Sequence, residues 1–94
     1  MVQRDEFLEK LNAAHAFPCS YTFKLIGPAE ARIEKDALDI VESEMPGTAP
    51  IVRTRHSAKG NHLSVTLVLP MPDAESVAHM YERFYAIDGL RMML

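Results

Sequence analysis

The chain has 94 residues, 48% hydrophobic and 24% charged, which is the composition of one small globular domain with a single core. Its formal net charge of −3 argues against a general nucleic-acid binder, which needs several cations to neutralise phosphates. No apolar run approaches the ~20 residues of a membrane span, and the single cysteine, Cys19, excludes an internal disulfide framework and suits a reducing compartment.

The first expected element is a helix from Arg4 to Ala14, with acidic residues in its N-terminal half and apolar residues at helical spacing. Phe17-Pro18 ends this helix because the residue before a proline disfavours helical geometry. Between residues 20 and 26 the period changes to two, which predicts a strand that is buried on one face. The apolar members of that alternation are Tyr21, Phe23 and Leu25.

The middle of the chain predicts a second helix followed by a hairpin. The helix is expected from Glu30 to Met45, with Pro46-Gly47 closing it. A basic, β-branched strand is expected over residues 51–57, and Lys59-Gly60-Asn61 forms the turn, where Gly60 is free to adopt positive φ. The longest strand follows, with apolar residues at Leu63, Val65, Leu67 and Leu69.

The last part of the chain predicts one more helix and a short strand. Asp73 is the expected N-cap, because its carboxylate can accept hydrogen bonds from the first free N–H groups of the helix. The apolar stripe of this helix consists of Val77, Met80, Tyr81 and Phe84. A terminal strand is expected over Leu90–Leu94, after the turn at Asp88-Gly89.

After the leading helix the expected order is β-α-β-β-α-β, which is the split-βαβ or ferredoxin-like pattern. Right-handed crossovers place the four strands in one antiparallel sheet in the order 4-1-3-2, with the two main helices on one face. We therefore expect an α+β sandwich that forms a single cytoplasmic domain over residues 1–94, with residues 1–16 as an N-terminal helical extension.

The sheet face opposite the two helices is expected to be polar. Its predicted members are Ser20, Thr22, Lys24, His62, Ser64, Thr66, Arg91 and Met93. Arg53 and Arg55 join this face if Val52 and Thr54 point inward, and Ile51 then faces outward too.

The charges are unevenly distributed along the chain. All 13 acidic residues lie in or beside the expected helices, and residues 48–72 contain none. The basic residues of the strands and hairpin are Lys24, Arg53, Arg55, Lys59 and Arg91. One interpretation is a basic sheet face that meets an anionic ligand or an acidic partner. The other is that strand and helix propensities, together with basic protection of edge strands, sort the charges in the same way.

The chain lacks a recognisable catalytic constellation. His56 and His62 flank the hairpin and could be cross-strand neighbours, but two histidines without a third ligand make a weak metal site. Cys19 has no cysteine partner, and Ser57 and Ser64 lack a His/Asp arrangement. The exposed strand positions also lack the aromatic rings on which RNA-binding sheets stack bases. We expect no enzyme activity, no metal and no cofactor.

Several phrases of the sequence resemble one family. They are Phe17-Pro18, Tyr21-Thr22-Phe23-Lys24, Gly27, Ser57-Ala58-Lys59-Gly60-Asn61, Ser64-Val65-Thr66 and Ile87-Asp88-Gly89-Leu90-Arg91-Met92-Met93-Leu94. They are similar to the YbeD-like family of small bacterial proteins of unknown function, over nearly all of residues 15–94. This resemblance implies a ferredoxin-like fold similar to ACT regulatory domains, and hence a stand-alone regulatory or ligand-sensing module.

The expected function is that of a non-enzymatic regulatory module which binds a protein partner or a small anionic metabolite. The residues expected to contribute are Lys24, Arg53, Arg55, Lys59, His62, Ser64 and Arg91. One alternative is a structural domain that self-associates without a ligand, since ACT-like domains often pair edge to edge or face to face. RNA binding is a third alternative. The sequence leaves the partner, the ligand and a homodimer open.

Overall fold

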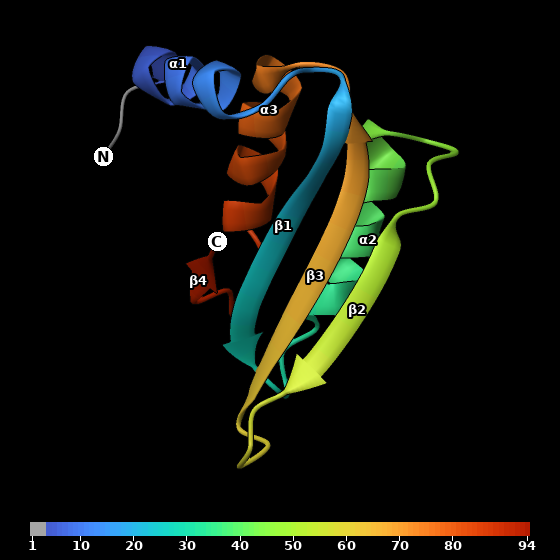
Figure 1. Cartoon of the computed structure of the whole chain (residues 1–94). Helices are drawn as coiled ribbons and strands as arrows, with labels where there is room; N and C mark the ends of the chain where they lie inside the picture. Colours follow the sequence, from blue (N-terminus) through green and yellow to red (C-terminus); the bar gives the residue numbers. More distant parts are fainter. Residues whose placement is uncertain (1–3) are drawn as a thin grey trace.

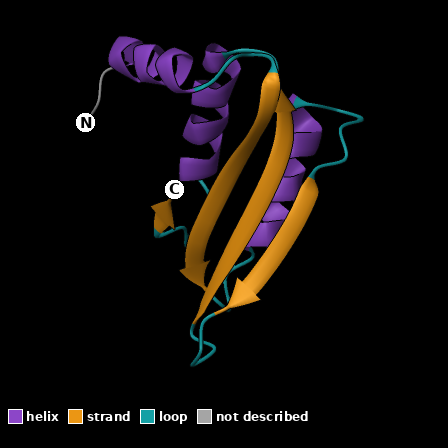
Figure 2. Ribbon diagram, in the orientation of Figure 1, coloured by secondary structure: helices purple, strands orange, loops and turns teal. Residues whose placement is uncertain are grey.

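The computed structural model describes residues 4–94, so residues 1–3 of the expected N-terminal extension over residues 1–16 lie outside the described part. The elements in chain order are α1 (Arg4–Ala14), β1 (Cys19–Pro28), α2 (Ile33–Glu44), β2 (Ile51–His56), β3 (His62–Met71), α3 (Ala74–Tyr85) and β4 (Met92–Met93) (Figure 2). This order confirms the ferredoxin-like prediction, although β4 is shorter than the strand expected over Leu90–Leu94.

The four strands form one antiparallel sheet in the order β2-β3-β1-β4, which is the predicted order 4-1-3-2 read from the other edge. Helices α2 and α3 lie against the same face of this sheet, and α1 lies beside α3 (Figure 1). The opposite face carries no helix from the described part of the chain, as is common for antiparallel sheets. None of the helices within residues 4–94 is both long enough and apolar enough to cross a bilayer.

The core lies between the sheet and the two covering helices. Phe23 and Leu25 of β1 and Leu67 of β3 are fully buried, as the alternation in the sequence predicted. From α3, Phe84 packs its ring edge-on against Phe23, with ring centroids 5.3 Å apart. Burying one such side chain contributes about 1.5–3 kcal/mol. These apolar contacts explain why both helices lie on one face and leave the other uncovered.

Helix α1 docks on α3 through a small aromatic contact. The ring of Phe7 meets the edge of the Tyr81 ring at a centroid distance of 5.5 Å, and Leu11 is the one residue of α1 that is buried. Arg4 adds an exposed salt bridge to Glu82 of α3. Close to this contact, the hydroxyl oxygens of Tyr21 and Tyr81 lie 2.9 Å apart and share a hydrogen bond.

Two local predictions about helix and turn chemistry are confirmed. The carboxylate of Asp73 accepts a hydrogen bond from the backbone N–H of Ser76 at 2.7 Å, which caps α3. That N–H and the Ser76 side chain lower the pKa of Asp73 below its ordinary value, because both favour the ionised carboxylate. In the hairpin, Gly60 has φ of 74°, the left-handed geometry that glycine adopts without steric cost.

Gly27 of β1 provides a test of the packing at the β1–α2 junction. A Cβ atom at this position would lie 2.2 Å from Cδ1 of Ile33 and 2.8 Å from the carbonyl oxygen of Gly89. We predict that Gly27→Ala destabilises the fold by about 1–3 kcal/mol, as overpacking typically does. Urea unfolding followed by circular dichroism measures this change. The exposed substitution Lys59→Ala is the control, and equal stability of both variants would contradict the prediction.

The buried phenol of Tyr81 should make the folded domain less stable in alkaline solution. Burial, and then the hydrogen bond with Tyr21, raise the pKa of Tyr81 well above its ordinary value. The phenol therefore stays neutral in the folded chain, whereas it ionises above about pH 10 in the unfolded chain. The contribution of the neutral phenol to the free energy of unfolding is present below that pH and is lost as the pH rises. Urea midpoints measured between pH 8 and 11 should fall less steeply for Tyr81→Phe than for the wild type. Parallel curves would refute this account.

Candidate functional site

The uncovered face of the sheet is ordered into cross-strand rows. In one row Arg53 of β2 lies opposite Thr66 of β3, and Thr66 lies opposite Lys24 of β1. In the next row Arg55 lies opposite Ser64, and Ser64 lies opposite Ile26 of β1. Neighbouring strands are about 4.8 Å apart, and alternate residues of one strand are ~6.5–7 Å apart. Three cations therefore surround two hydroxyl groups at the centre of the sheet.

The register of β2 settles the condition that the sequence left open. Val52 pairs with the buried Leu67, and Thr54 pairs with the buried Val65, so both share the helix-facing side. The arginines between and after them therefore lie on the uncovered face. Ile51 has the same parity as the arginines and is 60% exposed, as the alternation required. We use the name basic face for Lys24, Arg53, Arg55, His62, Ser64 and Thr66.

The cations of the basic face form no salt bridge with an acidic residue of the described chain, residues 4–94. The salt bridges in this part of the chain all join helical residues, namely Arg4–Glu82, Lys35–Asp39, His79–Glu44 and Arg83–Glu44. Lys24, Arg53 and Arg55 are exposed and take part in none of them. The charge separation expected from the sequence is therefore present in three dimensions.

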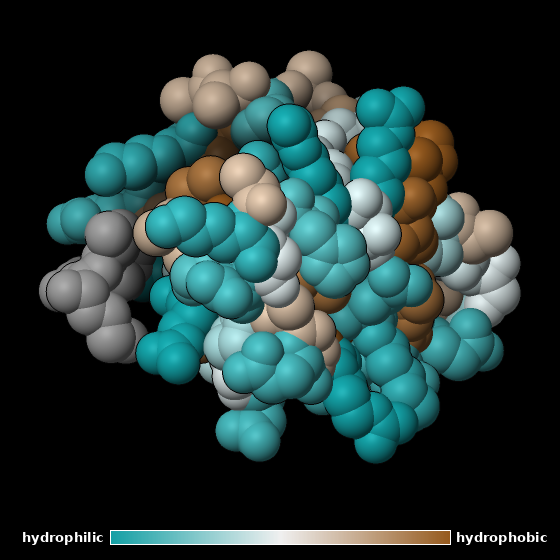
Figure 3. Space-filling view, turned by 90° about the horizontal axis from the view of Figure 1, so that it is seen from below, coloured by the Kyte–Doolittle hydropathy of each residue, from teal (hydrophilic) through white to brown (hydrophobic). Residues whose placement is uncertain are grey.

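A hollow of about 450 Å³ lies where the basic face meets the hairpin. Lys24 and Arg55 line it from two strands, and His62 and Ser64 line it from the strand between them. No carboxylate from residues 4–94 lines it, and the rest of the lining is Ile26, His56, Ser57, Ala58 and Leu63. Figure 3 views the molecule from this end and shows hydrophilic side chains over much of its surface. The hollow is suited to an anionic group that can accept hydrogen bonds.

The two serines near the hollow are engaged in structural hydrogen bonds. The Ser57 hydroxyl oxygen accepts from the backbone N–H of His62 at 3.1 Å and so closes the hairpin. The Ser64 hydroxyl donates to the carbonyl oxygen of Arg55 at 3.4 Å, across β2 and β3. Both hydroxyls therefore hold the hairpin in the register that aligns the basic residues.

The predicted placement of Met93 on the uncovered face is wrong. Met93 pairs with the buried Leu25 and is itself buried, whereas Met92 is 52% exposed. Arg91 lies just before β4 and does not line the hollow, and its N–H donates to the carbonyl oxygen of Ile26 at 2.9 Å. The error arose because an apolar run of three residues carries no alternation that fixes the face of a strand.

His56 and His62 do not form a directly opposed cross-strand pair, although both line the hollow. His56 pairs with Leu63, so its side chain lies on the helix-facing side of the sheet. The side chain of His62 lies on the basic face. Lys59 lies at the tip of the hairpin and does not line the hollow. Within residues 4–94 no three His, Cys, Asp or Glu side chains come close enough to hold a metal ion.

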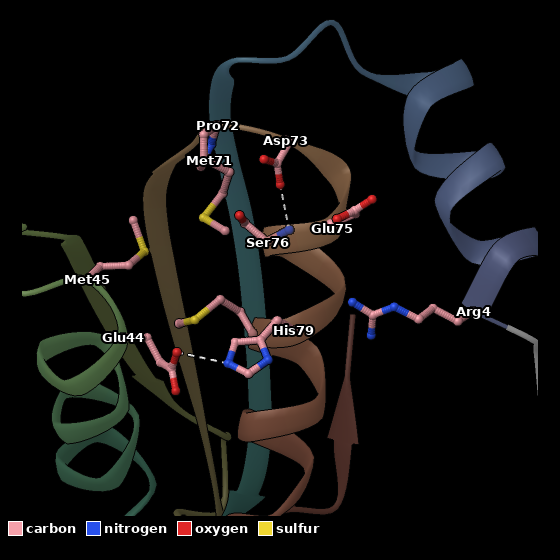
Figure 4. A pocket seen from close by; sticks show the side chains of 10 residues that line it. Arg4, Glu44, Met45, Met71, Pro72, Asp73, Glu75, Ser76 and His79 are labelled. Atoms are coloured by element: carbon pink, nitrogen blue, oxygen red, sulfur yellow. Dashed lines mark hydrogen bonds and ion pairs between the residues drawn. The ribbon is translucent and has the colours of Figure 1, made fainter.

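A second hollow, which the sequence did not suggest, lies between the end of α2 and the start of α3 (Figure 4). In it a Glu44 oxygen lies 2.8 Å from Nε2 of His79, and the other Glu44 oxygen accepts a hydrogen bond from Arg83. Asp73 and Glu75 add further acidic groups to its rim. Glu44 thus joins α2 to α3, and the four-residue spacing of His79 and Arg83 was the available sequence signal.

The arrangement of the strands and helices defines a ferredoxin-like α+β domain of the ACT-like type. A search of solved structures found similarity to the ACT domain from a GTP pyrophosphokinase of Chlorobium tepidum, with a TM-score of 0.57 and 8% sequence identity. The match covers 81% of this chain and 97% of that chain. At this low identity the likeness shows the fold alone.

Residues 12–94 match the family described as "Protein of unknown function (DUF493)", and the chain belongs to this family. A UPF0250 protein of Vibrio cholerae is 35% identical over 86 residues, covering 90% of this chain and 91% of the relative. A UPF0250 protein of Sodalis glossinidius is also 35% identical over 86 residues, covering 90% of this chain and 97% of the relative. These matches confirm the resemblance to small bacterial proteins of unknown function.

The faces assigned to β4 can be tested with two adjacent residues of the same type. We predict that Met93→Ala destabilises the fold by about 2–3 kcal/mol, because it removes buried methylene groups. Met92→Ala should change stability by less than about 0.5 kcal/mol, because that side chain is solvent-exposed. Chemical denaturation of the two variants measures the difference. A larger effect at Met92 would reverse the assignment of faces.

Proposed function

We propose that this protein is a non-catalytic regulatory module whose basic face binds an anionic partner. The observation that supports it is the meeting of Lys24, Arg53 and Arg55 on an uncovered sheet face, without an ion-pair partner in residues 4–94. Edge protection alone accounts less well for Lys24, because it lies on the central strand β1 rather than at an edge.

The geometry of the basic face matches the chemistry of carboxylate and phosphate groups. A guanidinium can donate two parallel hydrogen bonds to such a group, which adds direction to the charge attraction. Arg53 and Arg55 are alternate residues of β2 and repel each other, and a bound anion relieves that repulsion. Ser64 and Thr66 supply hydroxyl groups between the arginines and Lys24. An acidic protein surface and a small anionic metabolite both carry the required groups.

A regulatory rather than catalytic role is supported by the groups that surround the hollow. A nucleophile needs a base within hydrogen-bond reach, but the Ser57 hydroxyl accepts a backbone N–H and the Ser64 hydroxyl donates to a backbone carbonyl. The ACT-like fold supports the same proposal, since similar domains serve regulation.

Charge reversal on the basic face tests this function. We predict that Arg53→Glu with Arg55→Glu abolishes capture of the proteins and small molecules that the wild type retains from native cell extract, because it replaces attraction with repulsion. Quantitative mass spectrometry of the retained material is the measurement, and circular dichroism checks that the domain stays folded.

The matched control is Lys10→Glu with Arg32→Glu. These two cations are exposed on α1 and just before α2 and form no salt bridge within residues 4–94, and their reversal lowers the net charge by the same amount without altering the basic face. The control should retain the partners, and raising the salt concentration should release them from the wild type. Retention of the same partners by the Arg53/Arg55 variant would overturn the proposal.

A further inference from the structure

Strand β2 lies at an edge of the sheet, and no strand of the described residues pairs with its outer side (Figure 1). The direction of its backbone groups follows from the neighbouring strands. The N–H and C=O groups of Lys24 both bond to Leu94, so they point toward the β4 side. Lys24 and Thr66 therefore form a non-hydrogen-bonded pair, and the backbone groups of Thr66 point to Arg53 of β2.

The alternation of an antiparallel ladder then assigns the other residues of β2. Ile51, Arg53 and Arg55 bond to β3, whereas the N–H and C=O groups of Val52, Thr54 and His56 point away from the sheet. The hairpin agrees with this assignment, because Ser57 donates its N–H to His62 at 2.9 Å. Three residues of β2 thus present backbone donors and acceptors for an additional strand.

The side chains of β2 indicate what such a strand would contain. On an added strand, the residues opposite Arg53 and Arg55 occupy non-hydrogen-bonded pairs, where side chains of paired strands come closest. Acidic residues at two alternate positions would place their carboxylates beside the two guanidinium groups. A third alternate position would lie opposite Ile51, whose side chain is 60% exposed and suited to an apolar neighbour.

We infer that β2 is the docking edge for an extended acidic segment of another protein, which pairs with it as an antiparallel fifth strand. This inference rests on the proposed function and identifies the anionic partner as a peptide with the pattern acid-x-acid-x-apolar. Main-chain hydrogen bonds provide affinity in this mode of recognition, and alternate side chains provide specificity. Thr54 and His56 are exposed on the helix-facing side, so that side of the edge is also accessible.

Pairing of β2 with a second copy of itself is disfavoured by the same arginines. A two-fold axis at Thr54 places Arg53 opposite Arg55 of the other copy, and an axis at either arginine places that arginine opposite itself. Like charges directly opposite destabilise paired strands. An axis at Val52 avoids these like-charge pairs, but it places Pro50 opposite Thr54 of the other copy, and Pro50 has no N–H to donate.

The direct test uses a fluorescent peptide containing Glu-Thr-Glu-Val-Ile. We predict saturable binding, measured by fluorescence anisotropy, and selective protection from hydrogen exchange of the Val52, Thr54 and His56 amides. Replacing both glutamates by glutamine should weaken binding at least about fivefold, since charge-assisted hydrogen bonds are roughly twice as strong as neutral ones. Absence of protection at saturating peptide would overturn the inference.

Backbone methylation of the peptide provides a control that leaves the protein unchanged. The threonine, at the second position of this peptide, lies opposite Thr54 in a hydrogen-bonded pair, so methylating its nitrogen should weaken binding at least about tenfold. Methylating the second glutamate nitrogen, which points away from β2, should change affinity by less than about threefold. Equal effects of the two methyl groups would contradict strand pairing.

A matched pair of protein variants separates this inference from the proposed function. Thr54→Pro removes an N–H that points to solvent and should reduce peptide binding, whereas Thr54→Val keeps the N–H and should preserve binding. The Arg53→Glu and Arg55→Glu variant could lose the native partners while Thr54→Pro still binds the peptide fully. That result would overturn strand pairing and leave the basic face as the site. Protection of the β2 amides by self-association without peptide would also overturn the inference.

Discussion

The pairing of β1 with β3 is the constraint on which the rest of the structure depends. Ten residues of each strand are paired without interruption, from Cys19 opposite Met71 to Pro28 opposite His62. Because side chains alternate with a period of two, this register puts every apolar residue of both strands that serves the core on one face. A slip by one residue would move Phe23 and its neighbours into water, so the buried aromatic contacts and the register stabilise each other.

The same register creates the charge pattern of the molecule. Once the apolar residues of β3 face the helices, Ser64 and Thr66 must face away, and the strand on each side adds its own outward residues. Lys24 comes from one neighbour, and Arg53 and Arg55 come from the other. The acids remain on or beside the helices, on the other side of the sheet. A separation that could arise from residue propensities thus becomes a surface with a defined spacing of cations.

The alternating strands, the glycine turn and the capped helix could be predicted because each has a local physical signature. Tyr21 to Leu25 and Leu63 to Leu69 display a clear period of two, and both strands proved to be central. Local signals were insufficient at the end of the chain, where β4 has only two residues and its face depends on pairing with Leu25. The cross-strand partners of His56 and His62 were left open for a similar reason, since they depend on how the ladder closes at Ser57.

The sequence by itself determined the class of fold, the order of the elements, the buried faces of the two central strands and the absence of acids over residues 48–72. Those features depend on periodicity and composition, which are written along the chain. Only the tertiary structure decided that β2 places both arginines beside Ser64 and Thr66, that Met92 rather than Met93 is exposed, and that Glu44 joins two helices. These outcomes depend on hydrogen-bond register and packing between distant segments, and no local pattern specifies either.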